Sequence, residues 1–156
     1  MTRNLPHLPL TGACRCGKVR LRITAEPIVT MACHCTGCQK MTAGPYSLSV
    51  AIPAHGFSVP EGEPVIGGLH GDMLHHFACP HCLSWMFTRI ESLPDMVNVR
   101  ATMLDDLSWY RPFIETYTCE KLAFAGTGAA HSFERFPPMD AFPGLIAAYQ
   151  ARETTA

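Results

Sequence analysis

The stretch Cys33-His34-Cys35-Thr36-Gly37-Cys38 places three cysteines within six residues. Two further clusters accompany it, Cys14-Arg15-Cys16 upstream and Cys79-Pro80-His81-Cys82 downstream, so seven of the eight cysteines lie in three short segments. Cysteines this close along the chain can share one short loop, which directs their sulfurs at a single ion without long-range folding. The pattern predicts a metal-binding protein, with the central cluster in a loop that Gly37 allows to turn tightly.

The compartment decides between metal binding and disulfides. Residues Met1 to Leu10 contain Pro6 and Pro9 and no continuous apolar run, which is not the pattern of a secretory signal. We therefore expect a cytoplasmic protein, and in a reducing cytoplasm these cysteines favour metal ligation over a disulfide framework.

Length and composition predict one domain spanning residues 1–156, since a chain of this size can bury its own core. An apolar content of 47% with a formal charge of −1 is typical of a folded soluble protein. Lys and Arg are scattered singly, so no nucleic-acid partner is expected. The uncharged residues 41–60 are interrupted by Pro45, Pro53 and Pro60, so no membrane span is expected either. Nothing in the sequence sets the oligomeric state.

Apolar residues alternate with polar or small ones in several short segments, as in half-buried strands. The segments with this pattern are 18–23, 46–52, 57–59, 65–66, 74–78, 85–88, 96–102 and 113–118. The pair Cys79 and Cys82 lies between two of them, at the tip of a predicted hairpin. Many short strands separated by Pro and Gly predict an all-β domain.

The C-terminal part of the chain gives weaker signals. Gly and Pro residues in the segment 120–138 predict a wrapping loop, to which we assign no chemistry. A short helix should follow, with Asp140 as its cap and Pro143 in its first turn. Leu145, Ile146 and Tyr149 are expected on its buried side.

The cysteines divide naturally into one closed and one open site. Structural zinc takes four protein ligands, whereas catalytic zinc takes three and keeps one position open. The two outer clusters supply a four-sulfur set, Cys14, Cys16, Cys79 and Cys82, and the central cluster supplies Cys33, Cys35 and Cys38. Spacing alone leaves exchanges open, because Cys38, His34 or His81 can replace a member of the closed set.

The open site suits thiol chemistry. Three thiolates on a dication carry a net charge of about −1, which makes a poor Lewis acid for generating hydroxide. A sulfur-rich site can instead assist the deprotonation of an incoming thiol and hold its sulfur. The alternative is a second structural site completed by a histidine. The sequence offers no confident general acid or base.

Residues near the clusters have simpler explanations. The three histidines that precede the downstream cluster, His70, His75 and His76, are expected to face solvent or to form hydrogen bonds. Cys119 stands outside all clusters and is expected to be a buried small apolar residue.

Three motifs together resemble the signature of the glutathione-dependent formaldehyde-activating enzyme family, to which centromere protein V also belongs. They are Gly12-x-Cys14-x-Cys16-Gly17-x-Val19, Cys33-His34-Cys35-x-x-Cys38 with Gly44 following, and Phe77-x-Cys79-x-x-Cys82. The resemblance covers roughly residues 12 to 118. One departure is Leu83, where the family usually has Gly; a positive φ there would cost about 1 kcal/mol.

The resemblance implies an Mss4-like fold, a strongly curled pair of β-sheets (a β-tent), with the short C-terminal helix added. It implies two zinc ions per chain, a structural zinc on Cys14, Cys16, Cys79 and Cys82 and a catalytic zinc on Cys33, Cys35 and Cys38. The implied activity is that of a carbon–sulfur lyase joining formaldehyde and glutathione as S-hydroxymethylglutathione.

A rival function comes from a different class. The same zinc-held β fold can serve as a non-catalytic module that binds a protein partner, as the Mss4 resemblance allows. A fourth protein ligand in the central cluster would favour the module, and an open position would favour the enzyme. Nothing in the residues identifies a glutathione carboxylate clamp, so glutathione as the thiol rests on the family resemblance alone.

Overall fold

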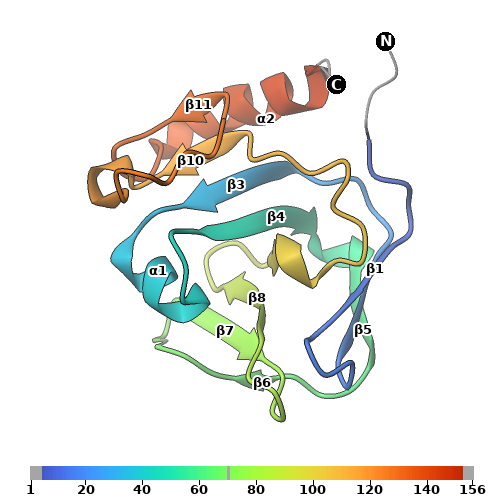
Figure 1. The fold of residues 1–156 in the computed structure, drawn as a ribbon. Coiled ribbons are helices and arrows are strands. Elements are labelled where there is room, and N and C mark those ends of the chain that lie inside the picture. Colours follow the sequence, from blue (N-terminus) through green and yellow to red (C-terminus); the bar gives the residue numbers. More distant parts are fainter. Residues whose placement is uncertain (1–4, 70, 153–156) are drawn as a thin grey trace.

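A computed structural model describes residues 5–69 and 71–152. Short strands dominate it, and two short α helices lie outside the sheets (Figure 1). The strands are β1 (Leu10–Ala13), β2 (Arg20–Ile23), β3 (Val29–Cys33), β4 (Ser47–Pro53), β5 (Phe57–Glu61), β6 (Val65–Ile66), β7 (Leu74–Ala78), β8 (Trp85–Ile90), β9 (Met96–Arg100), β10 (Ile114–Thr116) and β11 (His131–Ser132). The helices are α1 (Thr36–Thr42) and α2 (Phe142–Ala151), with 3-10 turns η1 (Ala54–Gly56), η2 (Ala101–Met103), η3 (Thr118–Glu120) and η4 (Met139–Ala141).

The strands form two sheets. A three-stranded antiparallel sheet has the order β1-β2-β5, and an eight-stranded sheet has the order β11-β10-β3-β4-β9-β8-β7-β6. In the larger sheet β10 pairs in parallel with β3 and β11, and the other neighbours are antiparallel. This mostly β architecture of two sheets with a C-terminal helix confirms the predicted fold class.

The main core lies between the two sheets. The alternating residues Leu21 and Ile23 of β2 pack against Ile52 of β4 and Val97 and Val99 of β9, and all five are at most 1% exposed. Because every second residue of a strand points to the same face, the period seen in the sequence becomes this shared apolar layer.

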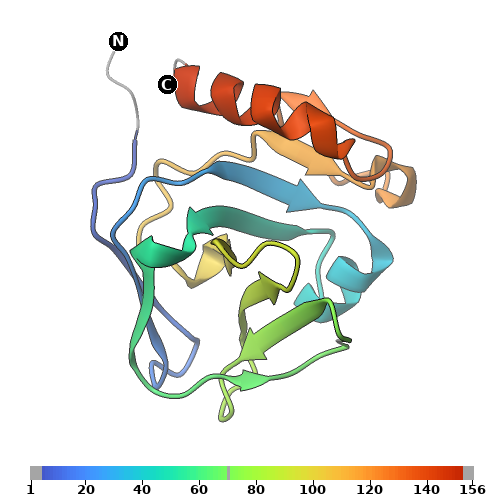
Figure 2. The same ribbon diagram turned by 180° about the vertical axis from the view of Figure 1, so that it is seen from behind.

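A second, smaller core lies beneath α2, which crosses the outer side of β3 and β10 (Figures 1 and 2). Leu145 and Tyr149 of the helix pack against Val29, Met31 and Ile114 of the two strands. The predicted buried side of the helix is therefore confirmed for these two residues, whereas Ile146, predicted to lie there as well, is only half-buried.

Three boundaries differ from the sequence prediction. The strand expected over 96–102 ends at Arg100, where η2 begins. The predicted cap at Asp140 is wrong: Asp140 lies inside η4, and the N-cap of α2 is Ala141, which makes no side-chain hydrogen bond. The loop expected over 120–138 contains β11, which pairs with β10 and so extends the large sheet.

Gly12 allows the two sheets to approach at one corner. A Cβ atom on Gly12 would lie 2.3 Å from the carbonyl oxygen of Met103, and Gly12 forms an isolated antiparallel bridge with Leu104. Only a residue without a side chain fits there.

Among the described residues, no helix has the length and apolar character that a membrane span requires.

Candidate metal centres

The outer clusters meet in space as a four-sulfur site. The Sγ atoms of Cys14, Cys16, Cys79 and Cys82 all lie within 4.8 Å of one another, with 3.5 Å between Cys14 and Cys16 and 3.7 Å between Cys16 and Cys79. Zn–S bonds of about 2.3 Å in a tetrahedron would separate the sulfurs by about 3.8 Å. The spacing therefore fits a tetrahedral metal ion. The structure brings together the same four cysteines that the sequence analysis grouped.

The local backbone explains how each half of this site forms. Cys14 directly follows β1, and its Sγ accepts a hydrogen bond from the backbone N–H of Val19 at 3.3 Å. Cys79 and Cys82 occupy the turn between β7 and β8, the predicted hairpin tip. In this turn the N–H of Leu83 donates to the carbonyl of Cys79 at 2.9 Å, which closes a tight knuckle.

Leu83 takes a conformation that favours glycine. Its φ is 60°, and its side chain is 74% exposed, so no packing compensates for the left-handed backbone. The positive φ considered for a leucine at this position is therefore present: the knuckle keeps its geometry, and Leu83 carries the backbone strain.

The central cluster combines the end of a strand with the start of a helix. Cys33 is the last residue of β3, Cys35 is the N-cap of α1, and Cys38 lies in its first turn. The Cys35 sulfur accepts a hydrogen bond from the N–H of Cys38 at 3.3 Å, as a serine or aspartate oxygen would at this position. The predicted loop is therefore wrong, because a sulfur acts as the capping acceptor that lets a seven-residue helix begin.

Gly37 does not serve the purpose expected of it. It lies within α1 and has no positive φ. A Cβ atom at this position would lie 3.8 Å from the Cys35 sulfur, an ordinary contact distance. The turn at the cluster comes from the Cys35 cap and the helix.

The three sulfurs of the central cluster also lie within 4.8 Å of one another, and each cysteine is partly exposed. Hydrogen bonds from Cys38, Thr116 and the backbone of Cys35 lower the pKa of Cys33 to about 5 despite its burial. The pKa of Cys38 is raised, because it shares its proton with Cys33 and is itself buried. The hydrogen bonds among these thiols therefore favour a thiolate within the cluster.

Among residues 5–69 and 71–152, no histidine or carboxylate joins either group of sulfurs. His34 is fully buried and turns away from the sulfurs, so that its Nε2 lies 2.9 Å from Oε2 of Glu115. The exchanges left open for His34 and His81 are thus not realised, and each group contains cysteines only.

Glu115 is the main feature that sequence reasoning missed. Burial would raise its pKa, but hydrogen bonds from Ser132, Thr127, His34 and Lys121 outweigh it and bring the pKa to about 2. The carboxylate is therefore ionised, and Nε2 of His34 donates to it. An isolated Glu in a short strand carries no motif, so no signal in the sequence marked it.

The segment 120–138 takes part in this network and is more than a wrapping loop. Besides the contacts of Lys121, Thr127 and Ser132 with Glu115, the Glu120 carboxylate accepts a hydrogen bond from the N–H of Thr36 at the start of α1. Gln39 of α1 donates to the carbonyls of His34 at 2.7 Å and Glu120 at 3.0 Å. The segment thus holds α1 in place beside the central cluster.

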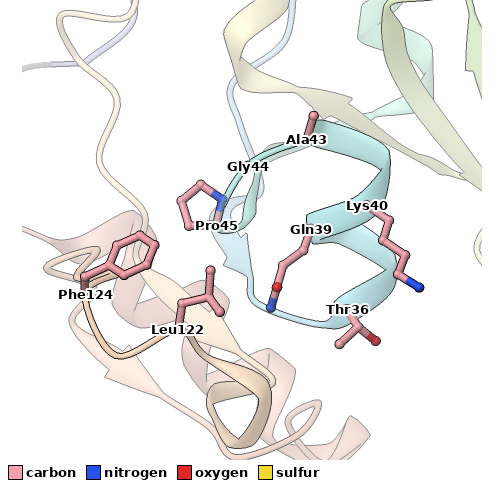
Figure 3. A pocket seen from close by; sticks show the side chains of 8 residues that line it. All are labelled: Thr36, Gln39, Lys40, Ala43, Gly44, Pro45, Leu122 and Phe124. Carbon is pink, nitrogen blue, oxygen red and sulfur yellow. The ribbon is translucent and has the colours of Figure 1, made fainter.

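A cavity of about 440 Å³ separates α1 from this segment. Figure 3 shows Pro45, Leu122 and Phe124 forming its apolar side, whereas the amine of Lys40 points away from them. Phe124 is 81% exposed. The side of this cavity that faces away from Lys40 is therefore apolar.

The remaining candidates have the simple roles expected, with one exception. His75 lies 3.5 Å from Glu91, and Nδ1 of His76 lies 2.9 Å from Oγ1 of Thr88, whereas His70 lies outside the described residues. Cys119 is exposed, which contradicts the predicted burial. Cys119 lies in the surface turn η3, where the neighbouring Glu120 is held by its hydrogen bond with the N–H of Thr36.

Comparisons with known proteins agree with this geometry. The structure is similar to the crystal structure of a Rhodobacter sphaeroides protein studied as a structural genomics target, with a TM-score of 0.51 and 17% identity over 61% of this chain and 87% of that chain. At this identity the likeness concerns the fold alone. A search of functionally curated proteins gave no significant match.

The sequence model of the glutathione-dependent formaldehyde-activating enzyme family matches residues 9–120. The matched part holds all seven clustered cysteines and both halves of the four-sulfur site. On this evidence the chain belongs to the glutathione-dependent formaldehyde-activating enzyme family.

Proposed function

We propose that the protein is a zinc-dependent carbon–sulfur lyase that joins a thiol, such as glutathione, to an aldehyde, such as formaldehyde, or splits their adduct. Zinc would be held at two places, a structural site on Cys14, Cys16, Cys79 and Cys82 and a catalytic site on Cys33, Cys35 and Cys38. Glutathione and formaldehyde are suggested by the family, and the cysteine-only donor sets favour zinc.

The observation that carries the proposal is the three-sulfur central cluster. Its sulfurs converge within 4.8 Å, they are partly exposed, and no fourth His, Cys, Asp or Glu among the described residues joins them. A closed structural site would need four protein ligands. A three-ligand set at the surface favours a site that receives an outside ligand, and so favours the enzyme over the partner-binding module.

The bound metal would lower the pKa of an incoming thiol and hold its sulfur. The chain's own residues hold the ligands in place: the helix N–H of Cys38 donates to Cys35, the Thr116 hydroxyl lies close to Cys33, and the Ser47 hydroxyl interacts with Cys38. Hydrogen bonds of this kind orient ligands and tune their basicity.

The reaction balances without a redox partner. The thiol loses its proton, its sulfur attacks the carbonyl carbon, the C=O π bond breaks, and the carbonyl oxygen takes up a proton. The product is R–S–CH₂–OH when the aldehyde is formaldehyde, and the reverse sequence splits the adduct.

The rest of the chain would support this function as one domain over residues 1–156, since β10 and β11 extend the sheet that carries Cys33. All eight cysteines are free thiols in the structure, and thiolate sites of this kind need a reducing compartment. We therefore propose a cytoplasmic location.

The test begins with elemental analysis of the reduced protein, which should contain two zinc ions per chain. The exchange rate between glutathione with formaldehyde and S-hydroxymethylglutathione should then be measured by NMR with and without the protein. We expect acceleration by the parent and by the control variant Cys119→Ser, which lies outside both clusters. One zinc or fewer after reconstitution, or no acceleration with any thiol and aldehyde, would refute the proposal.

A further inference from the structure

Arg100 ends β9 beside the central cluster. In the sheet it lies opposite Ser49 of β4, and its Nη1 reaches Oγ of Ser47 at 3.4 Å. The small side chains of these serines leave room for a long side chain on this face. The strand register therefore brings the Arg100 guanidinium toward the sulfurs at the end of β3 and the start of α1.

Among the described residues this buried guanidinium has no carboxylate partner, and the negative charges that act on it are those of the cluster thiols Cys38 and Cys33. Arg100 is 6% exposed and lies 4.1 Å from the ring centroid of Trp85. Its other hydrogen-bond partner is the neutral carbonyl of Asn98 at 3.3 Å, and its Nε has no partner. Among the described residues no Asp or Glu forms an ion pair with it. Buried charges are normally paired, because an unpaired one is costly.

A cavity of about 230 Å³ adjoins this side chain. Arg100 and Trp85 line it together with the hydroxyl-bearing Thr42, Ser84 and Thr102, and the remaining lining residues are Leu or Met. No acidic residue lines it. Pockets for drug-sized ligands have volumes of roughly 300–1,000 Å³, so this one suits a smaller molecule. Its lining suits an anion with a short apolar part.

The cavity and the central cluster are close neighbours. The Ser47 hydroxyl that contacts Arg100 also bonds to the thiol of Cys38, so one hydroxyl separates the guanidinium from a ligand sulfur. Thr42, on the cavity wall, donates to the carbonyl of Cys38 at 2.8 Å. A ligand sulfur at the cluster and an anion in the cavity would therefore be only a few bonds apart.

We propose that this cavity is the carboxylate subsite of the enzyme, with Arg100 selecting small mercaptocarboxylates whose carboxylate lies within a few bonds of the sulfur. The inference rests on the proposed function for the role of the sulfur, and on the buried guanidinium for the role of the carboxylate. An arginine can bind a carboxylate through two parallel N–H donors.

Charge explains why such a residue is needed. A dication with three thiolates has a net charge of about −1, and a bound substrate thiolate makes it about −2. A substrate carboxylate would be repelled by this site unless a cation faced it. Of the residues that the structure describes, Arg100 is the only cation that lines the cavity.

The main experiment compares two thiols that differ in charge. Calorimetric titration of the zinc-loaded protein with 3-mercaptopropionate and with 3-mercapto-1-propanol should show at least about tenfold tighter binding of the acid, as expected for a charge-assisted hydrogen bond. Arg100→Gln should abolish this preference. Arg89→Gln is the matched control, because Arg89 also lies over an aromatic ring, that of Phe57, but is exposed. It should keep the preference.

Two further measurements protect the test if Arg100→Gln fails to fold. Thr102→Phe keeps the charge but fills the cavity, and it should also reduce the preference for the acid. In the parent, propionate should shift the NMR signal of the Trp85 indole N–H. The indole N–H signal of Trp109 should not move, because Trp109 does not line the cavity and its N–H donates to the carbonyl of Asp106. Propionate carries no sulfur, so this readout does not depend on thiol chemistry.

The outcomes separate the two proposals. A propionate response at Trp85 without any thiol turnover would refute the proposed function and support the subsite. Equal binding of the two thiols, or an equal loss for both in Arg100→Gln, would mean that Arg100 only balances the thiolate charge, and would overturn the subsite. Tighter binding of glutathione than of 3-mercaptopropionate would overturn the assignment to short mercaptocarboxylates.

Discussion

The imidazole of His34 and the carboxylate of Glu115 form a buried pair, with Nε2 and Oε2 2.9 Å apart. His34 stands between two cysteines of the central cluster, and Glu115 stands in β10, 81 residues further along the chain. Lys121, Thr127 and Ser132 complete the shell of donors around the carboxylate. This pair therefore links β10 to the backbone of His34, which lies between the two cysteines Cys33 and Cys35.

Replacement of Glu115 by Gln should therefore destabilise the protein. The variant removes a buried charge that accepts hydrogen bonds from four side chains, and the expected loss in the free energy of unfolding is roughly 3 kcal/mol. Urea unfolding at pH 7 measures it. Exposed Glu134→Gln is the control and should change stability by less than about 0.5 kcal/mol. Equal effects of the two variants would show that the network adds nothing to stability.

The effect of Glu115→Gln should depend on pH in a defined direction. The pKa of Glu115 in the folded state, about 2, lies below the ordinary value of 4.5 for a glutamate. A carboxyl with a lowered pKa stabilises the fold above its unfolded pKa and loses that contribution as pH falls through the folded pKa. The stability difference between parent and variant should thus be full above about pH 4.5 and shrink toward pH 2. A difference that grows on acidification would contradict the assignment.

Loss of the two metal sites should have different consequences. Cys14→Ser should unfold or aggregate the chain, because the four-sulfur site joins segments 63 residues apart and metal binding contributes to folding. Cys35→Ser should leave a folded protein with one zinc and no thiol chemistry, because its cluster closes no long loop. Thermal unfolding, zinc content and thiol–aldehyde turnover should be measured for both. If Cys35→Ser loses as much stability as Cys14→Ser, or keeps full turnover, the catalytic assignment of the central cluster is wrong.

Leu83→Gly should stabilise the knuckle. Leu83 has a φ of 60° and an exposed side chain, so glycine relieves the left-handed strain at little cost in burial. The expected gain is about 1 kcal/mol, measured as a rise in the unfolding midpoint. Leu83→Ala is the matched control, since alanine keeps the Cβ atom and should bring no comparable gain. A lower midpoint for the glycine variant would show that the leucine side chain matters more than the strain.

Cys119→Ser should leave zinc content and activity unchanged, because Cys119 belongs to neither group of sulfurs. Since it is exposed, a thiol reagent should modify Cys119 first in the zinc-loaded parent, and mass spectrometry of peptides would identify the site. Loss of a zinc ion in this variant would overturn the ligand assignment.

Local patterns in the sequence determined much of the fold. Alternation in segments such as 18–23 and 57–59 predicted strands that the structure contains, because a strand's side-chain period of two appears directly in the residues. The pair Cys79 and Cys82 was placed correctly at a hairpin tip, and the positive φ at Leu83 was expected from the glycine that the family usually has there. These features depend on neighbours only a few residues away.

The tertiary structure alone decided what depends on distant residues. It excluded the exchanges of ligands that spacing had left open between the two cysteine sets, paired His34 with Glu115, and directed Arg100 toward the central cluster. Spacing along the chain could not exclude His34 as a ligand, because its orientation is set by a carboxylate on another strand. The sequence also did not predict the short helix α1, whose N-cap is the Cys35 sulfur, or the exposure of Cys119. Both depend on hydrogen bonds that the local pattern of apolar and polar residues does not indicate.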